Sequence, residues 1–179
     1  DAARDGINLG EGAATVILSS QKNSEGDIRI SGGSVSNDAN HISGPSRTGE
    51  ELFQAIGRAM KDAGVSAADI DFISAHGTAT IYNDEMESKA INLAGLQGVP
   101  VNSLKGFYGH TLGAAGLIES VAALQSMKKE LILPTPGFVN MGVSEPVNVC
   151  SSLLSKPSRH CLKTASGFGG CNAALVLSK

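Results

Sequence analysis

The sequence lacks tryptophan and long apolar runs, and aromatic residues make up only 4% of its 179 residues. A membrane-spanning helix needs about 18 or more consecutive apolar residues, so we expect no membrane partner. The segment at Asp1 has no signal-like apolar region, and cytoplasmic residence is the expectation. Because glycine occurs 22 times while large aromatic side chains are scarce, the core should consist of small and aliphatic side chains in close contact.

The sequence also has no large excess of charge of one sign, since the net charge is −3 with acidic and basic residues well mixed. This pattern excludes the basic stripe of a nucleic-acid-binding protein. The three cysteines, Cys150, Cys161 and Cys171, are spaced ten or eleven residues apart, which fits neither a disulfide framework nor the short-spaced pairs of a zinc site. We therefore predict three reduced thiols and no metal centre.

Apolar periodicity predicts an α/β protein. Short apolar runs indicate strands, and apolar residues at helical spacing indicate helices. Polar residues 19–26 should form a connection and residues 32–49 a long loop. The predicted strands cover residues 13–18, 27–31, 70–74, 99–103, 131–133, 147–149, 162–166 and 173–177, and the predicted helices cover residues 50–63, 112–127 and a segment capped by Asn83 or Asp84. This order of elements is typical of layered α/β domains.

Two histidines follow predicted strands. His76 opens the segment His-Gly-Thr-Ala-Thr after the strand at 70–74, and His110 lies in the loop after the strand at 99–103. Open α/β sheets bind ligands at the C-terminal ends of their parallel strands, so we expect both imidazoles at the same edge. Two neutral imidazoles can stabilise one developing oxyanion. The alternative for each histidine is a structural role in the core or at a cap.

Charged residues lie close to these histidines in the sequence. Lys105 precedes His110 by five residues, and Glu119 follows it by nine. A lysine at a sheet edge is usually solvated unless a carboxylate holds it, and Asp84, Glu87 and Glu119 are candidate holders. An ordinary surface ion pair explains such a set equally well.

A glycine-rich turn, Gly167–Asn172, lies downstream between two predicted strands. Its backbone N–H groups around Phe168 could point at an oxyanion, with the aromatic ring as a wall or gate. A plain tight hairpin is the alternative.

The segments His76–Thr80, Lys105–Glu119 and Gly167–Asn172, in this order, resemble the C-terminal half of a β-ketoacyl-acyl carrier protein synthase of the thiolase superfamily. Asp5–Ala13 resembles that family's Asp-Gly-x-x-x-Gly-Glu-Gly segment, and Asp38–Ser43 resembles its pantetheine-side loop. The similarity extends over essentially the whole chain.

The resemblance implies a thiolase-like layered α/β fold with a mixed sheet, of which this chain is the C-terminal half of the duplicated β-α-β-α-β-β unit. It assigns residues 1–31 to the tail end of the N-terminal thiolase-like half and residues 32–179 to the C-terminal domain. Because the sequence starts with Asp1 rather than Met, we expect it to be part of a longer polypeptide.

The implied activity is a decarboxylative Claisen condensation of an acyl thioester with malonyl-acyl carrier protein, in fatty acid or polyketide synthesis. By resemblance, His76 and His110 hydrogen-bond the malonyl thioester carbonyl and stabilise the enolate that forms as CO2 leaves. Lys105 organises the site through Glu119 and Asp84.

The resemblance also implies residues that meet the substrate carrier. Thr78 and Thr80, with Ser43, match positions that contact the phosphopantetheine arm, and Phe168 with Gly169 matches the gate and oxyanion turn. No cofactor is implied beyond the phosphopantetheine of acyl carrier protein, which carries the substrates. The implied partners are this carrier protein, the missing N-terminal half of the same protein, and a second copy in a homodimer.

The nucleophilic cysteine of that family would lie before Asp1, and no cysteine in this chain replaces it. Cys150 and Cys161 lie outside the strand-to-helix turn that could lower a thiol pKa, and Cys171 stands where the family has threonine. The residues 1–179 alone should therefore not condense acyl thioesters. Two alternatives remain: a non-catalytic chain-length-factor-like subunit that binds acyl chains, and a thiolase-like enzyme that condenses without decarboxylation, against which the His76-Gly-Thr motif argues.

Overall fold

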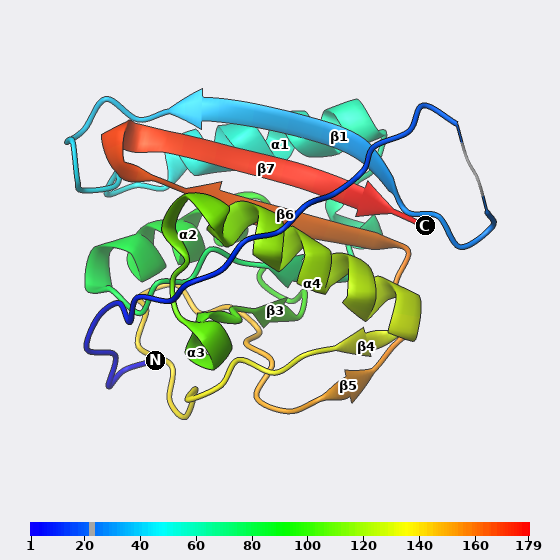
Figure 1. Ribbon diagram of the computed structural model, residues 1–179. Helices are drawn as coiled ribbons and strands as arrows, with labels where there is room; N and C mark the ends of the chain where they lie inside the picture. The colour runs from blue at the N-terminus through cyan, green and yellow to red at the C-terminus, as the bar shows by residue number, and fades with distance from the viewer. Residues whose placement is uncertain (22–23) are drawn as a thin grey trace.

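The computed structural model describes residues 1–21 and 24–179 and contains a mixed sheet with helices on both faces (Figure 1). The helices are α1 (Glu50–Ala63), α2 (Ile81–Leu93), α3 (Lys105–Tyr108) and α4 (Ala115–Lys129), with short 3₁₀ turns η1 (Ala67–Asp69), η2 (Leu112–Ala114) and η3 (Phe168–Gly170). The strands are β1 (Arg29–Asn37), β2 (Phe72–Ser74), β3 (Val101–Asn102), β4 (Leu131–Ile132), β5 (Leu154–Ser155), β6 (His160–Ser166) and β7 (Cys171–Ser178). The predicted α/β class with a mixed sheet is confirmed.

The main sheet has the strand order β1-β7-β6-β2-β3. β2 is parallel to both of its neighbours, whereas β7 is antiparallel to β1 and β6. Ser74 at the end of β2 lies opposite Asn102 of β3 and Lys163 of β6. The loops that follow β2 and β3 therefore leave the sheet at the same edge, as the sequence predicted for the two histidines. The predicted closing hairpin is confirmed as β6 and β7.

Helix α1 has the predicted bounds. The four residues that it buries recur at helical spacing and face the sheet: Leu52, Ala55, Ile56 and Ala59. Acidic residues occupy its first turn, where the helix dipole favours negative charge. Gly64 ends the helix in the left-handed conformation at φ 69°, and its N–H bonds to the carbonyls of Lys61 and Met60.

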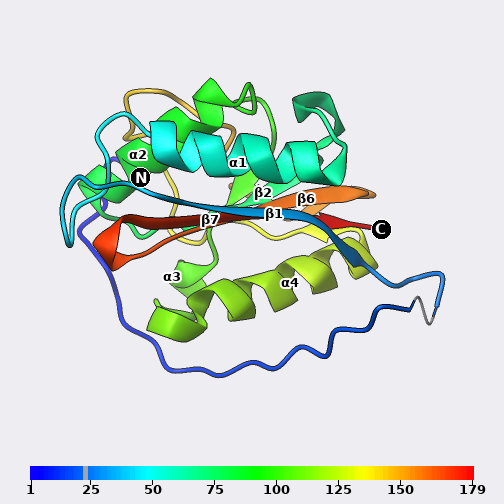
Figure 2. The same cartoon turned by 90° about the horizontal axis from the view of Figure 1, so that it is seen from above.

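Apolar side chains are buried on both faces of the sheet. α1 and α2 cover one face, where Ile56, Met86 and Ile73 belong to the larger cluster. α4 covers the other, where Phe72 and Met127 belong to the smaller one (Figure 2). Phe72 and Ile73 are neighbours on β2 and point to opposite faces, as strand geometry requires. In residues 1–21 and 24–179, no helix combines the length and apolar character needed to span a membrane.

The strand predicted at residues 13–18 does not form. This segment runs along the outer side of α4 (Figure 2) and pairs with no strand among the described residues. Ile17 and Leu18 are 92% and 72% exposed. A strand needs a neighbour for its backbone N–H and C=O groups, so β-branched composition alone was not sufficient. The predicted connection at 19–26 includes residues 22–23, which lie outside the described residues.

The loop predicted at residues 32–49 is wrong for its first part, because β1 continues to Asn37 against β7. Glycines at 32 and 33 obscured this strand in the sequence, since glycine usually weakens strands. Gly32 serves close packing: a Cβ at this position would lie 2.2 Å from the carbonyl oxygen of Ala59 on α1.

Two helix starts also differ from the prediction. α2 begins at Ile81 with Thr80 as N-cap, not at Asn83 or Asp84, because the Asp84 N–H already donates a helical hydrogen bond to the Thr80 carbonyl at 3.1 Å. The helix predicted from Leu112 starts as the 3₁₀ turn η2 and becomes α-helical at Ala115.

We predict opposite effects of alanine at two glycines. Gly32→Ala should lower the free energy of unfolding by about 1–3 kcal/mol, because the new methyl group must displace the α1 backbone. Gly57→Ala, inside α1 where an added Cβ would have no neighbour outside the helix backbone within 4 Å, should raise it by up to about 1 kcal/mol through helix propensity. Urea-induced unfolding measures both. Equal stability of the two variants would contradict the observed β1–α1 packing.

Candidate active site

His76 and His110 lie together at the C-terminal edge of β2 and β3. Their ring centroids are 5.1 Å apart, and the rings meet edge to face at 85°. His76 is buried, with 6% of its surface exposed, and His110 is half-buried. The prediction that parallel strands bring both imidazoles to one edge is confirmed.

The loop that carries His76 is fixed through its backbone. Both carboxylate oxygens of Glu87, from α2, accept hydrogen bonds from the N–H groups of His76 (2.8 Å) and Gly77 (2.7 Å). The Thr164 hydroxyl of β6 donates to the same carboxylate at 2.6 Å. Gly77 has φ 42°, and a Cβ there would lie 2.5 Å from the Cβ of Ser103. Glycine is therefore required where the two loops touch.

The loop that carries His110 is held by the N-terminal segment. The His110 N–H donates to the Asn8 carbonyl at 2.7 Å, and the Gly10 N–H donates to the His110 carbonyl at 3.0 Å. Gly109 has φ 76°, and a Cβ there would lie 2.8 Å from the backbone of Leu9. The glycines allow the two backbones to cross in contact, which sets the position of the His110 ring.

Hydrogen bonds assign the same tautomer to both histidines. Nδ1 of His76 lies 3.3 Å from the Nζ of Lys105, which can only donate. Nδ1 of His110 accepts the Leu112 N–H at 3.0 Å. A neutral imidazole that accepts at Nδ1 carries its proton on Nε2. Each ring therefore has an Nε2–H group to donate.

The surroundings also keep both rings neutral. Burial, followed by the charges of Lys105 and Lys163 and the nearby His110, lowers the pKa of His76 to about 2. Burial and Lys105 also lower the pKa of His110, against the opposing effect of Glu119. Neutral N–H donors can thus persist across the physiological pH range.

Lys105 is held by Glu119, as expected. Its ammonium group contacts Oε1 of Glu119 and the backbone carbonyl of His76, besides Nδ1 of that histidine. Burial lowers the pKa of Lys105, although the Glu119 charge counteracts this. Glu119 is fully buried on α4 and also pairs with Lys163, whose Nζ lies 2.6 Å from Oε2.

Asp84 does not hold Lys105, which corrects the role expected for it. Its carboxylate accepts the Thr78 N–H and lies 3.6 Å from the Nε of Arg4. Burial, followed by repulsion from Glu87, raises the pKa of Asp84 to about 6. Glu87 was another candidate holder of the lysine, but its oxygens bind the His76 loop instead.

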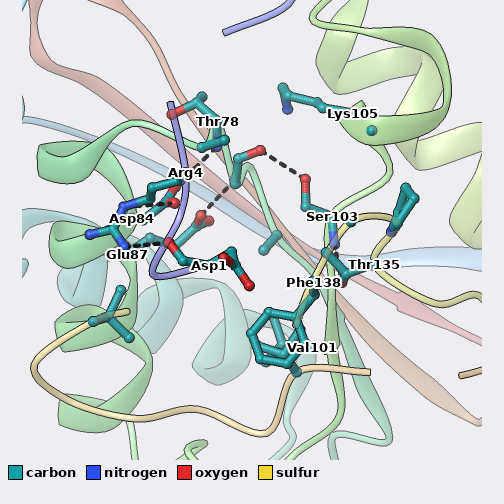
Figure 3. A pocket seen from close by; sticks show the side chains of 18 of the residues that line it. Asp1, Arg4, Thr78, Asp84, Glu87, Val101, Ser103, Lys105, Thr135 and Phe138 are labelled. Carbon is teal, nitrogen blue, oxygen red and sulfur yellow. Dashed lines mark hydrogen bonds and ion pairs between the residues drawn. The ribbon is translucent and has the colours of Figure 1, made fainter. Parts of the chain in front are cut away.

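A cavity of about 680 Å³ opens beside this cluster. Figure 3 shows Arg4, Asp84 and Thr78 on one side and Ser103, Thr135 and Phe138 on the other. His110 and Lys105 also line it. These two side chains therefore border a space that can take a ligand with both apolar and polar parts.

Among the described residues, the remaining predicted site residues make no hydrogen bond to His76, His110, Lys105 or Glu119, and Thr78 bonds through its N–H to Asp84. The Thr78 and Thr80 hydroxyls bond to each other at 2.8 Å. Ser43 lies on the exposed loop after β1 and bonds to His41. Phe168 is 80% exposed at the tip of the β6–β7 hairpin, and Gly169 beside it has φ 81°.

Sequence reasoning missed Lys163. This residue lies in the middle of β6 in the run Cys161-Leu-Lys-Thr-Ala165, and its side chain is only 3% exposed. A single charge inside an otherwise apolar central strand was the available signal, because such a charge must be paired when buried.

None of the three cysteines is placed as a nucleophile beside the two histidines. Burial raises the pKa of Cys150, and it raises that of Cys161 to about 12, so both thiols stay protonated and inert. Cys171 is exposed at the start of β7. The expectation that no cysteine of this chain supplies the thiolate is consistent with these positions.

Two neutral imidazole donors at the ends of adjacent parallel strands define an α/β domain that can stabilise an oxyanion. Residues 28–139 match the family described as "Beta-ketoacyl synthase, C-terminal domain". The chain belongs to this family, so the resemblance inferred from its motifs is confirmed.

The chain is similar to complete synthases over slightly less than half of their length. The 3-oxoacyl-[acyl-carrier-protein] synthase 2 of Rhizobium meliloti is 35% identical across 100% of this chain and 44% of that protein. The synthase of the same name from Vibrio cholerae is 33% identical across 100% of this chain and 46% of that protein.

Solved structures confirm the thiolase-like ketosynthase fold. The ishigamide ketosynthase/chain length factor superposes with a TM-score of 0.87 and 30% identity, over 100% of this chain and 46% of that chain. A type II polyketide synthase acyl-carrier protein in complex with its ketosynthase gives a TM-score of 0.76 and 33% identity, over 83% of this chain and 38% of the other.

We predict that His76 and His110 are both neutral Nε2–H tautomers at pH 7. Nitrogen-15 NMR of histidine-labelled protein should show Nδ1 as the unprotonated nitrogen in each ring, because each accepts a hydrogen bond. His76 should stay neutral at pH 5, whereas in urea it should titrate near pH 6.5. An Nδ1–H tautomer for either ring would contradict the assignment.

The depressed pKa of His76 also predicts how stability depends on pH. Below pH 6.5 the unfolded chain takes up a proton at His76 that the folded protein does not take up until about pH 2, so this residue makes stability fall as pH falls through that window. His76→Gln should flatten that part of the stability profile. An unchanged slope would show that His76 ionises normally in the folded protein.

We predict that Glu119→Gln lowers the free energy of unfolding by about 3–5 kcal/mol, because two buried ammonium groups lose their shared carboxylate. Glu130→Gln is the matched control, since Glu130 follows α4 with a side chain that is 51% exposed. It should change stability by no more than about 1 kcal/mol. Urea unfolding distinguishes the two, and similar small effects would show that Glu119 is not buried between charges.

Proposed function

We propose that this chain is the C-terminal part of a 3-oxoacyl-[acyl-carrier-protein] synthase, which joins an acyl thioester to malonyl-acyl carrier protein with loss of CO2. The observation that carries this proposal is the pair of adjacent, neutral Nε2–H donors on His76 and His110. Membership in the family and the names of its relatives support the substrate class.

The chemistry of decarboxylation needs such donors. As the malonyl carboxylate leaves as CO2, its bonding electrons move toward the thioester carbonyl, whose oxygen becomes an enolate oxygen. Fixed N–H donors stabilise this negative charge as it develops, most strongly where water is excluded. Lys105 positions His76 by donating to its Nδ1 and carbonyl oxygen. The enolate carbon then attacks the carbonyl carbon of the acyl thioester, so that the new C–C bond forms while the C–S bond breaks and the thiolate leaves.

The second substrate, the acyl thioester, requires a nucleophilic cysteine to hold its acyl group. We assign this cysteine to a preceding half of the same protein. The inert positions of Cys150 and Cys161 support this division. We further propose that the described residues before β1, 1–21 and 24–28, belong structurally to that half. The exposed apolar side chains Ile17 and Leu18 would then be covered.

We propose that the cavity beside Thr78 receives the phosphopantetheine arm of acyl carrier protein, with Thr80 and Ser43 as further contacts. Phe168 would act as the gate and Gly169 as part of an oxyanion turn, a role that suits their exposed hairpin tip. Substrates would arrive on the carrier, with no resident cofactor. Cytoplasmic residence and homodimerisation complete the proposal.

A non-catalytic chain-length-factor-like subunit is the second candidate, because the similar ishigamide structure is named for a ketosynthase and a chain length factor. The retained contact of Lys105 with both Glu119 and His76 favours the enzyme. A subunit that only binds acyl chains has no need of that polar cluster.

We predict that the full-length protein containing this chain decarboxylates malonyl-acyl carrier protein, and that His76→Ala or His110→Ala lowers the rate about 100- to 1,000-fold, the usual effect of removing an oxyanion donor. Release of CO2 from labelled malonyl thioester measures the rate. His160→Ala, at the start of β6 and at the opposite end of the sheet from His76, is the control and should retain full activity.

The outcomes separate the two candidates. A wild-type protein that binds the acyl carrier but releases no CO2 would support the non-catalytic subunit. Wild-type activity that survives both histidine substitutions would overturn the proposed roles of His76 and His110.

A further inference from the structure

Lys163 is a second buried ammonium group in the candidate site. It projects from β6 toward α4, whereas the adjacent Thr164 projects to the other face and bonds to Glu87. Its Nζ lies 2.6 Å from Oε2 of Glu119, 2.5 Å from the carbonyl oxygen of Thr164 and 3.2 Å from that of Ser74. The carbonyl oxygen of Ala75 is 3.5 Å away. Four oxygen atoms therefore surround this ammonium group.

Packing does not require this second charge. Glu119 is already neutralised by Lys105 through Oε1, and one ammonium suffices to compensate one buried carboxylate. Burial of an additional ammonium carries a desolvation penalty that an apolar side chain would avoid. The remaining nearby carboxylate, Glu87, is occupied with N–H and O–H donors on the other face.

The contacts of Lys163 connect it to His76 in two ways. By occupying Oε2 of Glu119, it leaves Oε1 for Lys105, whose other donors are directed at His76. By binding the carbonyls of Ser74 and Ala75, it fixes the two residues that immediately precede His76. Lys163 thus acts on His76 from the backbone side and through Lys105.

We propose that Lys163 is a positioning residue of the condensation site, whose ammonium group fixes Glu119 and the backbone before His76 and adds positive charge close to the His76 imidazole. This inference rests on the proposed function. The added positive charge favours a substrate that carries a carboxylate and becomes an enolate. The attraction between opposite charges is stronger in a buried site, because the effective dielectric constant there is low.

Three variants of the full-length protein test this role in malonyl decarboxylation, with kcat, KM and the urea midpoint measured for each. Lys163→Met removes the charge and keeps a side chain of similar length. Lys163→Ala leaves a space for a small cation. Lys128→Met, at the exposed C-terminal end of α4, is the matched control. Wild type and His76→Ala are measured first, because their activities establish the reaction independently of Lys163.

We expect Lys163→Met to lower kcat about tenfold or more with KM nearly unchanged, and to unfold at the same or a higher urea concentration, since Lys105 still compensates Glu119. Ammonium chloride should raise the kcat of Lys163→Ala several-fold by restoring the missing charge and donors. Tetramethylammonium chloride at equal ionic strength should not, because the larger ion has no N–H group. Lys128→Met should match wild type throughout.

Two results would overturn the proposal while the reaction itself stands. One is a Lys163→Met protein with wild-type kcat. The other is a lowered urea midpoint of Lys163→Met together with no response of Lys163→Ala to ammonium, which would assign Lys163 to stability alone. An inactive wild type would instead refute the proposed function on which the inference rests.

Discussion

The carboxylate of Glu119 is fully buried, and three elements meet at its two oxygens. α4 contributes Glu119, α3 contributes Lys105 and β6 contributes Lys163. A buried carboxylate without partners is strongly unfavourable, so α4 cannot slide along the sheet without separating both ion pairs. The same lysines reach the carbonyl oxygens around residues 74–76. The interaction that docks α4 on the sheet therefore also orients His76.

Around this charged centre, the backbone is held in conformations that most residues avoid. Gly77 and Gly109 take positive φ where loops touch, and a side chain at either position would collide with a neighbouring segment. Ala79 and Leu112 also have positive φ, at 58° and 53°, although neither is glycine. Such strain persists only where surrounding contacts determine the conformation, which is typical of functional sites. The hydrogen bonds of Glu87 and of the N-terminal segment supply those contacts on the two loops.

The charges are arranged so that Lys105 and Lys163 lie close to His76 while both imidazoles remain neutral. Burial and the two lysines both oppose protonation of His76, and Lys105 fixes its tautomer. A histidine pair among carboxylates would instead be protonated more easily. This arrangement suits a reaction in which negative charge appears on an oxygen, and it places the polar donors beside a cavity that is lined in part by apolar side chains.

Local sequence determined the elements with strong periodicity. α1 has its predicted bounds, because apolar spacing, acidic residues in the first turn and Gly64 all indicate the same helix. The motifs also identified His76, His110, Lys105 and Glu119, since few packing needs place such residues after strands. Composition gave a wrong prediction for two segments whose structure depends on strand pairing. Residues 13–18 have the composition of a strand but no neighbouring strand among the described residues. Gly32 and Gly33 have the composition of a loop but pair with β7.

Only the tertiary structure decided which carboxylate serves which group. Asp84, Glu87 and Glu119 were all candidate holders of Lys105 in the sequence, yet they bind Thr78, the His76 loop and the lysines respectively. Lys163 joined the site because β6 lies next to β2, an adjacency between residues almost ninety positions apart. Sequence by itself determined which chemical groups this protein has and the local elements that carry them. Their partners were decided in three dimensions, because hydrogen bonds and ion pairs depend on distances that only the packed sheet and helices set.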